Sequence, residues 1–458
     1  MNPGGALGGG VGGRSDKGLR LSLTETLRLA WADDDLRRRI LFVLLVFAVY
    51  ALGIHVAVPI PGVNTMELQR AMTDTSNPLF QMLNMLGGGG FKKLSIFALG
   101  ISPYITASII MQVLQQSLPA WKAEMQEGGE YARKQMNKRT RLFTIVLCFI
   151  QGFTMLNQLP PNIFTPGANL PLVKAGVAIF WMAGSMIMLW LGEQISERGI
   201  GNGTSLLIFG GIVISFPSIV QEVGRQLQDG VINYFQVSIL LLMFLATTWF
   251  IVFFTTAQRR IPIQHMRRNF GTKSMGGQTS YLPISVNMAG VIPVIFAITL
   301  LYMPYQLMSM FPPQSDGHRT MEQIAQFFSP DFTKWQGYVA AVIYMVMIFG
   351  FTYLWNAMVY NVEDIANNLK RGGSYVPGIR PGKQTIDFLN GIISRVTFVG
   401  ALFLSFVAMT QFIFPLIAPS VRVSLGLMSG TSLLIMVSVA LETMRQIEAN
   451  LMVKQFGG

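Results

Sequence analysis

The stretch VINYFQVSILLLMFLATTWFIVFFTTA, residues 231–257, contains no Asp, Glu, Lys or Arg. An α-helix of about 20 apolar residues crosses the ~30 Å hydrocarbon core of a bilayer, so this stretch predicts a membrane-spanning helix. The composition of the whole chain agrees, because 51% of its 458 residues are hydrophobic and 12% are charged. Soluble domains carry about 25% charged residues. The sequence therefore predicts a protein whose main solvent is lipid.

Long apolar runs recur along the chain and predict ten spans in total. The other nine lie near residues 40–58, 94–117, 142–159, 171–192, 204–220, 282–304, 336–359, 396–417 and 423–441. The predicted fold class is an all-α polytopic membrane protein with ten transmembrane helices. Two halves of five spans enter the membrane from opposite faces because five is odd, which is the arrangement of an inverted repeat.

Positive charge is distributed unevenly across the predicted membrane. With both termini on one side, that face carries 26 of the 34 Lys and Arg residues and 15 of the 22 acids, which leaves a charge of +11 there and +1 on the opposite face. The positive-inside rule makes the first face cytoplasmic. Topology thus accounts for the net charge of +12, and we do not expect direct DNA binding.

The predicted spans divide the chain into four segments. These are a cytoplasmic N-terminal tail (1–39), an N-terminal half (40–220), a C-terminal half (221–441) and a cytoplasmic C-terminal tail (442–458). The first 18 residues of the N-terminal tail are rich in glycine and have no apolar core of a cleavable signal, so we expect them to be disordered. The single cysteine, Cys148, lies in the third span and has no partner for a disulfide within the chain.

The spans lack the residues that catalysis, metal binding or proton transport would need. Their cores contain essentially no ionisable side chain, the three histidines have no metal-ligand spacing, and no HExxH or GxSxG motif occurs. The glycines at 87–90 have no GK[ST] after them and follow no strand, so they do not predict a phosphate-binding loop. We therefore expect that the protein is not an enzyme and that it binds no cofactor and no metal ion. A sodium-coupled carrier that uses backbone carbonyls stays open.

Two long basic cytoplasmic loops, 258–281 and 360–394, carry the distinctive polar chemistry. The first contains five basic residues and no acid, and the second contains VPGIRPG, 376–382. There the prolines fix φ and the glycines free it, so Arg380 stands on a defined turn. Such loops could merely enforce topology and touch anionic lipid, or they could dock an acidic or phosphate-bearing partner. A topology signal needs positive charge but no defined backbone conformation. The defined turn therefore favours the interpretation that these loops dock a partner.

A short apolar stretch follows the first span: NPLFQMLNMLGGGGF, residues 77–91. At 1.5 Å per residue, a helix from Pro78 to Leu86 would be only ~14 Å long, about half of a bilayer core. It cannot cross the membrane. Taken alone, it could be an interfacial helix that lies on the membrane surface.

Several ordered stretches give the chain a resemblance to the SecY family, from about residue 20 to the last span. They are FALGISPYITASIIMQ (97–112), ERGIGNGTSLLIFGGIV (197–213), SYLPISVNMAGVIPVIFA (280–297), GGSYVPGIRPGKQT (372–385) and SGTSLLI (429–435). The resemblance implies two five-helix halves, hinged like a clamshell around a central hourglass pore. It implies a channel that conducts unfolded preproteins across the membrane and releases signal or transmembrane segments laterally into lipid.

The resemblance also implies that a ring of aliphatic side chains closes the pore waist. Isoleucines four residues apart share one helix face, and their β-branched side chains offer no hydrogen bond to water, so such a ring would gate by dewetting. Isoleucine is equally an ordinary lipid-facing residue. The ring positions that match the family are Ile101, Ile105, Ile208, Ile212, Ile295 and Ile435.

Two moving parts follow from the same resemblance. The stretch near 78–90 becomes a re-entrant plug helix beneath the ring, with a hinge at Gly87, Gly88, Gly89 and Gly90, because glycine resists helix and permits positive φ. A lateral gate would lie between spans two and three on one side and seven and eight on the other, where Gln112 and Gln151 could line the seam. The plug's soft apolar surface would comprise Leu79, Phe80, Met82, Leu83, Met85 and Leu86.

Partners are implied as well. SecY-like proteins dock the ribosome or the ATPase SecA on the two basic loops, and SecE and SecG accompany them. The expected location is the bacterial plasma membrane, with contact to lipid. The runner-up function is a secondary transporter of a small solute with inverted repeats, and a structural or lipid-organising scaffold would leave the loop motifs unexplained. The predicted partner-contact residues are Arg380, Arg259, Arg260, Arg267, Arg268 and Lys383.

Overall fold

The computed structural model describes most of the chain in long helices. The described residues are 23–58, 87–91, 93–157, 170–265, 269–270, 273–274, 279–308, 311, 315–328, 335–417 and 430–456. The helices of the N-terminal part are α1 (Leu23–Ala32), α2 (Asp34–His55), α5 (Ser102–Ser117), α6 (Pro119–Glu127), α7 (Gly129–Asn157), α8 (Leu170–Arg198) and α9 (Gly203–Gln228).

The C-terminal part adds further helices and five strands. Its helices are α10 (Tyr234–Thr256), α11 (Ile292–Leu301), α12 (Met303–Met308), α13 (Asp316–Phe328), α14 (Trp335–Val359), α15 (Val362–Arg371), α16 (Lys383–Ile417) and α17 (Gly430–Phe456). Its strands are β1 (Gln258–His265), β2 (Asn269–Phe270), β3 (Lys273–Ser274), β4 (Thr279–Ser285) and β5 (Ser374–Tyr375).

Local sequence sets where these helices begin. The Asn202 side chain accepts a hydrogen bond from the Ser205 N–H at 3.2 Å and thereby caps α9. At the start of α10, the Gln236 side chain reaches back and accepts from the Asn233 N–H at 3.0 Å. Both bonds satisfy backbone donors that a helix N-terminus otherwise leaves unpaired. α5 and α11 instead begin with proline in their first positions, where its missing N–H costs nothing.

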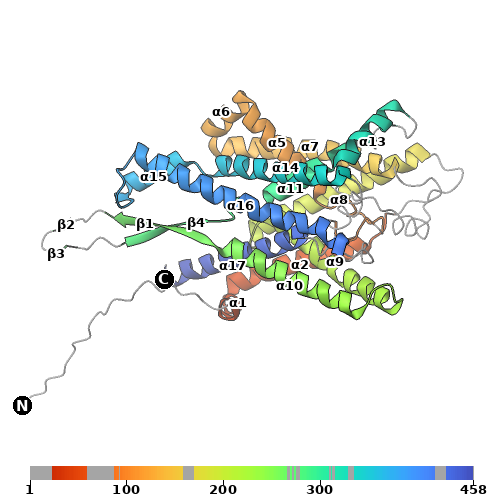
Figure 1. Cartoon of the computed structure of the whole chain (residues 1–458), viewed down its shortest axis with the longest axis horizontal. Helices are drawn as coiled ribbons and strands as arrows, with labels where there is room; N and C mark the ends of the chain where they lie inside the picture. The colour runs from red at the N-terminus through yellow and green to blue at the C-terminus, as the bar shows by residue number, and fades with distance from the viewer. Residues whose placement is uncertain are drawn as a thin grey trace, which may run out of the picture.

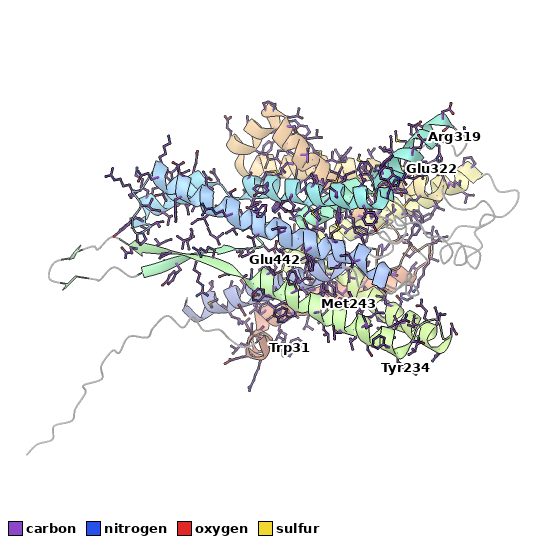
Figure 2. All side chains as sticks on the ribbon, viewed as in Figure 1. Trp31, Tyr234, Met243, Arg319, Glu322 and Glu442 are labelled. Carbon is purple, nitrogen blue, oxygen red and sulfur yellow. The ribbon has the colours of Figure 1, made fainter. Side chains whose placement is uncertain are left out.

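Seven of the described helices are long and apolar enough to cross a membrane: α2, α7, α8, α9, α10, α14 and α16. α10 contains the stretch 231–257 almost entirely, and it leaves large side chains uncovered along its length (Figure 2), with Tyr234 79% and Trp249 67% exposed. Such exposure suits lipid rather than water. The mainly helical, multi-pass membrane architecture is therefore confirmed, while the full count of ten spans stays a prediction.

The predicted spans 94–117 and 282–304 are wrong in their first parts. Residues 94–100 form turns, and helix begins only at Ser102. Residues 282–285 belong to strand β4, and α11 begins at Ile292. Their apolar character comes from packing inside the protein, which hydropathy cannot distinguish from contact with lipid. The predicted span 423–441 begins outside the described residues, and α17 is described from Gly430.

The basic stretch 258–281, which we expected as a loop, folds mostly as a β-hairpin. β1 pairs antiparallel with β4 from Gln258 opposite Ser285 to Gln264 opposite Thr279. The same strand pairs on its other side with β5, so the sheet order is β4-β1-β5. The second expected loop, 360–394, contains α15 and β5, and α16 already begins at Lys383. Composition predicted their charge but not this pairing.

The long helices run roughly side by side, and the sheet and α13 lie at opposite ends of them (Figure 1). β1, β4 and α15 lie at one end, together with the C-terminal part of α17, and α13 lies at the opposite end. α9 contacts both α2 and α17, so helices from the beginning and the end of the chain pack together. This arrangement leaves the ends of the spans on two distinct faces.

Candidate functional site

The six predicted ring isoleucines come from four separate parts of the chain and lie close together in the folded protein. Ile101 and Ile105 lie at the start of α5, Ile208 and Ile212 lie on α9, Ile295 on α11, and Ile435 on α17. Five of them belong to one buried hydrophobic cluster, here called the isoleucine cluster, and Ile295 packs against it. The cluster therefore joins elements of the N-terminal half to elements of the C-terminal half.

The isoleucine cluster is closely packed. Ile212 is 1% exposed, Ile101 and Ile435 are each 2% exposed, and Ile105 and Ile208 are also buried. The i, i+4 spacing of each pair puts both members on one helix face, as predicted. A constriction made from these side chains has only hydrocarbon to offer to water, since isoleucine carries no polar atom beyond its backbone. Such a constriction would resist ions when closed.

The sequence did not predict several other members of this cluster. Val46, Tyr50 and Ile54 form a stripe on α2 at i, i+4 and i+8, a periodicity that could have identified this buried face. Phe296, next to Ile295, contacts two aromatic rings of α14: its centroid lies 5.7 Å from that of Phe351 and 5.9 Å from that of Trp355. These contacts connect the cluster to α14, and no local pattern in the sequence predicts them.

The glycines predicted as a plug hinge form a largely buried turn against this cluster. The Gly90 N–H donates to the Gly87 carbonyl at 3.2 Å, and Gly88 and Gly89 both have positive φ. A Cβ at Gly88 would lie 2.7 Å from Cδ1 of Ile54 and 3.5 Å from the Cα of Gly211 on α9. Glycine at position 88 is favoured by its positive φ, and a Cβ there would also require Cδ1 of Ile54 to move, whereas the distance to Gly211 is an ordinary contact. The six predicted plug side chains, at 79, 80, 82, 83, 85 and 86, lie outside the described residues.

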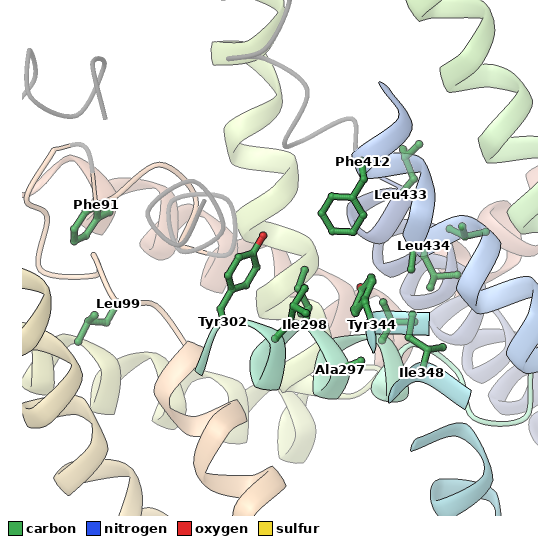
Figure 3. Close-up of a cluster of buried hydrophobic side chains, with 14 of the residues drawn as sticks. Phe91, Leu99, Ala297, Ile298, Tyr302, Tyr344, Ile348, Phe412, Leu433 and Leu434 are labelled. Carbon is green, nitrogen blue, oxygen red and sulfur yellow. The ribbon is translucent and has the colours of Figure 1, made fainter. Parts of the chain in front are cut away.

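A second buried cluster connects the same two halves beside the first (Figure 3). Ala297 and Ile298 of α11, with Tyr302 directly after it, lie between Leu99 on one side and Tyr344 and Ile348 of α14 on the other. Phe91, directly after the glycine turn, also belongs to it, and its ring centroid lies 5.6 Å from that of the buried Trp181. The chain segment that follows the glycines is thus anchored in the protein interior.

The two halves meet along a seam that involves the two helices that carry the predicted gate residues. α5 contacts α11, and α7 contacts α12. Gln151 on α7 is buried, whereas Gln112 on α5 is partly exposed. No direct contact between these two glutamines and the opposing half is described, so their role in a gate stays a prediction. The contacts of α5 and α7 with α11 and α12 nevertheless agree with a seam between spans two and three and span seven.

Four of the predicted partner-contact residues lie exposed at the end of the molecule that carries the sheet. Arg259 and Arg260 are on β1, Arg380 is on the turn after β5, and Lys383 begins α16. None of these four has a carboxylate within ion-pair distance among the described residues. Their role in partner contact stays a prediction. Arg267 and Arg268 fall outside the described residues.

At the same end of the molecule, ion pairs connect the two ends of the described chain. The Lys454 Nζ at the end of α17 donates to both carboxylate oxygens of Asp33 at 2.9 Å and lies 3.5 Å from a carboxylate oxygen of Asp35. The hydrogen bond from Lys454 lowers the pKa of Asp33, and the bond to Asp33 raises the pKa of Lys454. Asp33 also caps α2 by accepting from the Leu36 N–H at 3.1 Å.

Comparison with known proteins places this architecture in a family. The family model for SecY matches residues 95–444. A protein translocase subunit SecY of Halalkalibacterium halodurans is 39% identical over 437 residues, covering 93% of this chain and 96% of its own length. The corresponding subunit of Pseudomonas aeruginosa is 37% identical over 424 residues, covering 92% of each chain.

Solved structures agree in fold at lower identity. One described as "The structure of a protein conducting channel" has a TM-score of 0.63 at 19% identity and covers 91% of this chain and 93% of its own. The Sec61 channel from a canine ribosome–channel complex of the endoplasmic reticulum has a TM-score of 0.60 at 18% identity, with coverage of 91% and 93%. Small-solute transporters receive no support from these matches. On the family match and the relatives' identity, the chain belongs to the SecY family.

Proposed function

We propose that this chain forms a channel through which unfolded proteins cross the membrane, and that the isoleucine cluster is the constriction of its pore. The observation that carries the proposal is that isoleucines from α5, α9, α11 and α17 meet in one buried cluster shared by both halves. A pore formed between two halves needs its narrowest point where both contribute. Membership of the SecY family supports this function.

The chemistry of the six side chains suits a seal that must also yield. Isoleucine cannot replace the hydration shell of an ion, so a narrow apolar ring dewets and blocks ions without a covalent or ionic lock. A passing polypeptide can push such side chains apart, since no hydrogen bond or ion pair among them has to break. The seal then re-forms by hydrophobic contact alone.

The plug and the lateral gate extend this proposal. The segment 78–86 would fold back beneath the constriction, and the turn at 87–90 would fix where it enters, because that turn packs on α2 and α9. One related structure is described by its plug domain, which stabilises the closed state of that channel. The seam of α5 and α7 with α11 and α12 would open toward lipid to release signal or transmembrane segments.

The partners are proposed from the exposed basic end of the molecule. SecA, or the ribosome, would dock on β1 and on the turn around Arg380, and SecE and SecG would accompany the chain. Two structural neighbours are ribosome-bound channel complexes, which supports a cytoplasmic docking end. We further propose a bacterial plasma membrane location with both termini cytoplasmic, and no catalytic activity, so that energy comes from the partner or from the membrane potential.

Transport into vesicles tests this function. The chain, purified from native membrane with its companions and reconstituted into proteoliposomes, is expected to import a signal-bearing preprotein when SecA and ATP are supplied. Protease protection of the preprotein measures the import, and vesicles without SecA are the control. Accumulation of a small solute against its gradient, with no protein import, would instead favour the transporter.

A further inference from the structure

We propose that the described strands of the first cytoplasmic loop, residues 258–265 and 279–285, form one rigid docking platform with residues 362–385 of the second, so that SecA meets Arg260 and Arg380 as parts of a single preformed surface. This inference rests on the proposed function, because it concerns how the docking residues are held. The sequence presents two separate basic loops, more than 70 residues apart. The structure joins them through a sheet, a side-chain hydrogen bond and a common core.

The sheet supplies the first connection. β5 of the second loop adds to the free edge of β1 in the first, with Tyr375 opposite Gln264 and Ser374 opposite His265. At the same point the Tyr375 hydroxyl donates to Oε1 of Gln264 at 3.1 Å. Backbone pairing fixes the register of the two loops, and the side-chain bond adds a directional contact that only this register allows.

A small hydrophobic core supplies the second connection. Ile261 of β1 and Ile284 of β4 pack in one cluster with three residues of the second loop, and all five side chains are buried. The three are Ala366 of α15, Leu389 of α16 and Val376, which lies between β5 and α16. Val376 follows β5 directly and is 4% exposed. The hairpin is therefore seated on the helices of the second loop through its inward face. Two independent arms in solvent would have no reason to bury these residues.

A fixed turn extends this rigidity from Val376 to Arg380. The Ile379 N–H donates to the Val376 carbonyl at 3.1 Å, and the Thr385 hydroxyl donates to the Arg380 carbonyl at 3.0 Å. Gly378 and Gly382 adopt φ values of +81° and +115°, which L side chains rarely adopt. Arg380 is thus held between a buried anchor on one side and the start of α16 on the other.

The outward face of the platform is stiff as well. Arg260 lies opposite Pro283, and Pro262 lies opposite Tyr281, and all four are exposed on the face away from the core. Prolines restrict the backbone on both strands of the hairpin. A partner that binds such a surface avoids most of the entropy cost of ordering two loops, so affinity is gained by preorganisation.

Cysteines that join the loops test the proposal. In a Cys148→Ala background, Gln264→Cys with Tyr375→Cys places two thiols on opposed residues of antiparallel strands, where Cα atoms are about 4.5–5.5 Å apart and a disulfide can form. We expect efficient oxidation and an import rate within about twofold of the reduced protein, because the bond adds only a constraint that already exists. Gln258→Cys with Ser285→Cys, within the first loop alone, is the matched control.

A variant that weakens the connection between the two loops gives the complementary experiment. Val376→Gly removes the buried anchor beside β5 and frees its backbone, so we expect SecA binding to weaken by roughly fivefold to tenfold. Val376→Ile keeps the anchor and is expected to bind normally. The disulfide between positions 264 and 375 should restore most of the affinity lost in the Val376→Gly variant, which a general loss of stability would not permit.

The outcomes separate this inference from the proposed function. If Arg380→Glu leaves SecA binding and import unchanged, the docking assignment of the proposed function is wrong. If Arg380→Glu blocks import and the 264–375 disulfide also blocks it until reduced, the loops must separate and the single platform is wrong. Poor oxidation of the cysteine pair, or unchanged SecA binding by the Val376→Gly variant, would equally overturn it.

Discussion

At the scale of single residues, glycine decides how closely the turn before α5 approaches the isoleucine cluster. Gly88 has a φ of +66° and leaves room for Ile54 and for the Cα of Gly211, whereas Gly89 has a φ of +83° with open space around its Cβ position. The two glycines therefore make different demands. Gly89 is needed for backbone conformation alone, and Gly88 is needed for conformation and for contact.

Gly88→Ala is expected to destabilise the closed protein more than Gly89→Ala. Both changes cost about 1–2 kcal/mol for a left-handed conformation. Only the first also forces Cδ1 of the Ile54 side chain to shift. Thermal unfolding in detergent measures the loss, and closed-channel ion leakage should rise only for Gly88→Ala. Equal effects of the two substitutions would show that the close approach to Ile54 contributes nothing.

The ring isoleucines make the second prediction at this scale. Replacing Ile105 and Ile208 by glycine removes side chains from opposite elements of the cluster, so reconstituted membranes are expected to leak ions while import continues. Conductance across a planar bilayer measures the leak. Ile195→Gly, at a buried position of the same cluster on α8 that is not part of the ring, is the control and should lower stability without a leak. A leak of the same size from the control would argue against the ring.

At the scale of elements, the first two described helices, α1 and α2, pack against the last described helix, α17. α1 and α2 meet α17 in a small core that contains Ala30, Leu36, Ile447 and Leu451, and the Asp33–Lys454 ion pair covers it. This contact connects an element of the N-terminal half to the last helix. It is absent from any local sequence signal, since its partners are more than 400 residues apart.

The pKa shifts give this contact a defined pH range. The lowered pKa of Asp33 means that its contribution is present above the ordinary carboxyl value of 3.8 and is lost as pH falls through the folded value below it. The raised pKa of Lys454 means that its contribution is present below 10.5 and is lost as pH rises beyond it.

Lys454→Gln should therefore lower the unfolding temperature slightly at neutral pH. The difference from the unmodified protein should shrink as pH falls below 3.8 and through the lowered pKa of Asp33, because protonation removes the carboxylate charge. Scanning fluorimetry at several pH values measures it, and Lys134→Gln, which removes an ion pair confined to one helix, is the control. A difference that persists at low pH would exclude the carboxylate as the cause.

At the scale of the whole molecule, the structure separates two faces. The sheet lies at one end of the helices and α13 lies at the other (Figure 1), and Arg319 is an exposed residue of α13 (Figure 2). Charge sorting of the sequence predicts that the sheet end is cytoplasmic. Labelling from the two sides of the membrane tests this predicted topology.

Cysteines at Arg260 and Arg319 are expected to react with a membrane-impermeant maleimide from opposite sides of the membrane. Arg260→Cys should be labelled only in inside-out vesicles, and Arg319→Cys only in right-side-out vesicles or intact cells. Cys148 is buried, and replacing it by serine removes its background. Labelling of both positions from one side would contradict the topology.

The sequence by itself determined the solvent, the uneven distribution of positive charge and which isoleucines share a helix face. These follow from composition and local spacing: an uncharged run such as 231–257 has no other stable environment than lipid, and Ile208 with Ile212 share a face on any helix. The family resemblance then selected six isoleucines and Arg380 from many similar residues, and the structure brought the isoleucines together.

Only the tertiary structure decided which apolar stretches are not helical and which distant segments of the chain are in contact. Residues 282–285 are as apolar as a span, yet they pair with β1, because backbone hydrogen bonds and burial by α15 and α16 outweigh local preference. The contacts of Gly88 with α9, of Lys454 with Asp33 and of β5 with β1 join residues far apart in the chain. Such contacts depend on how whole elements pack, and no short stretch of sequence contains that information.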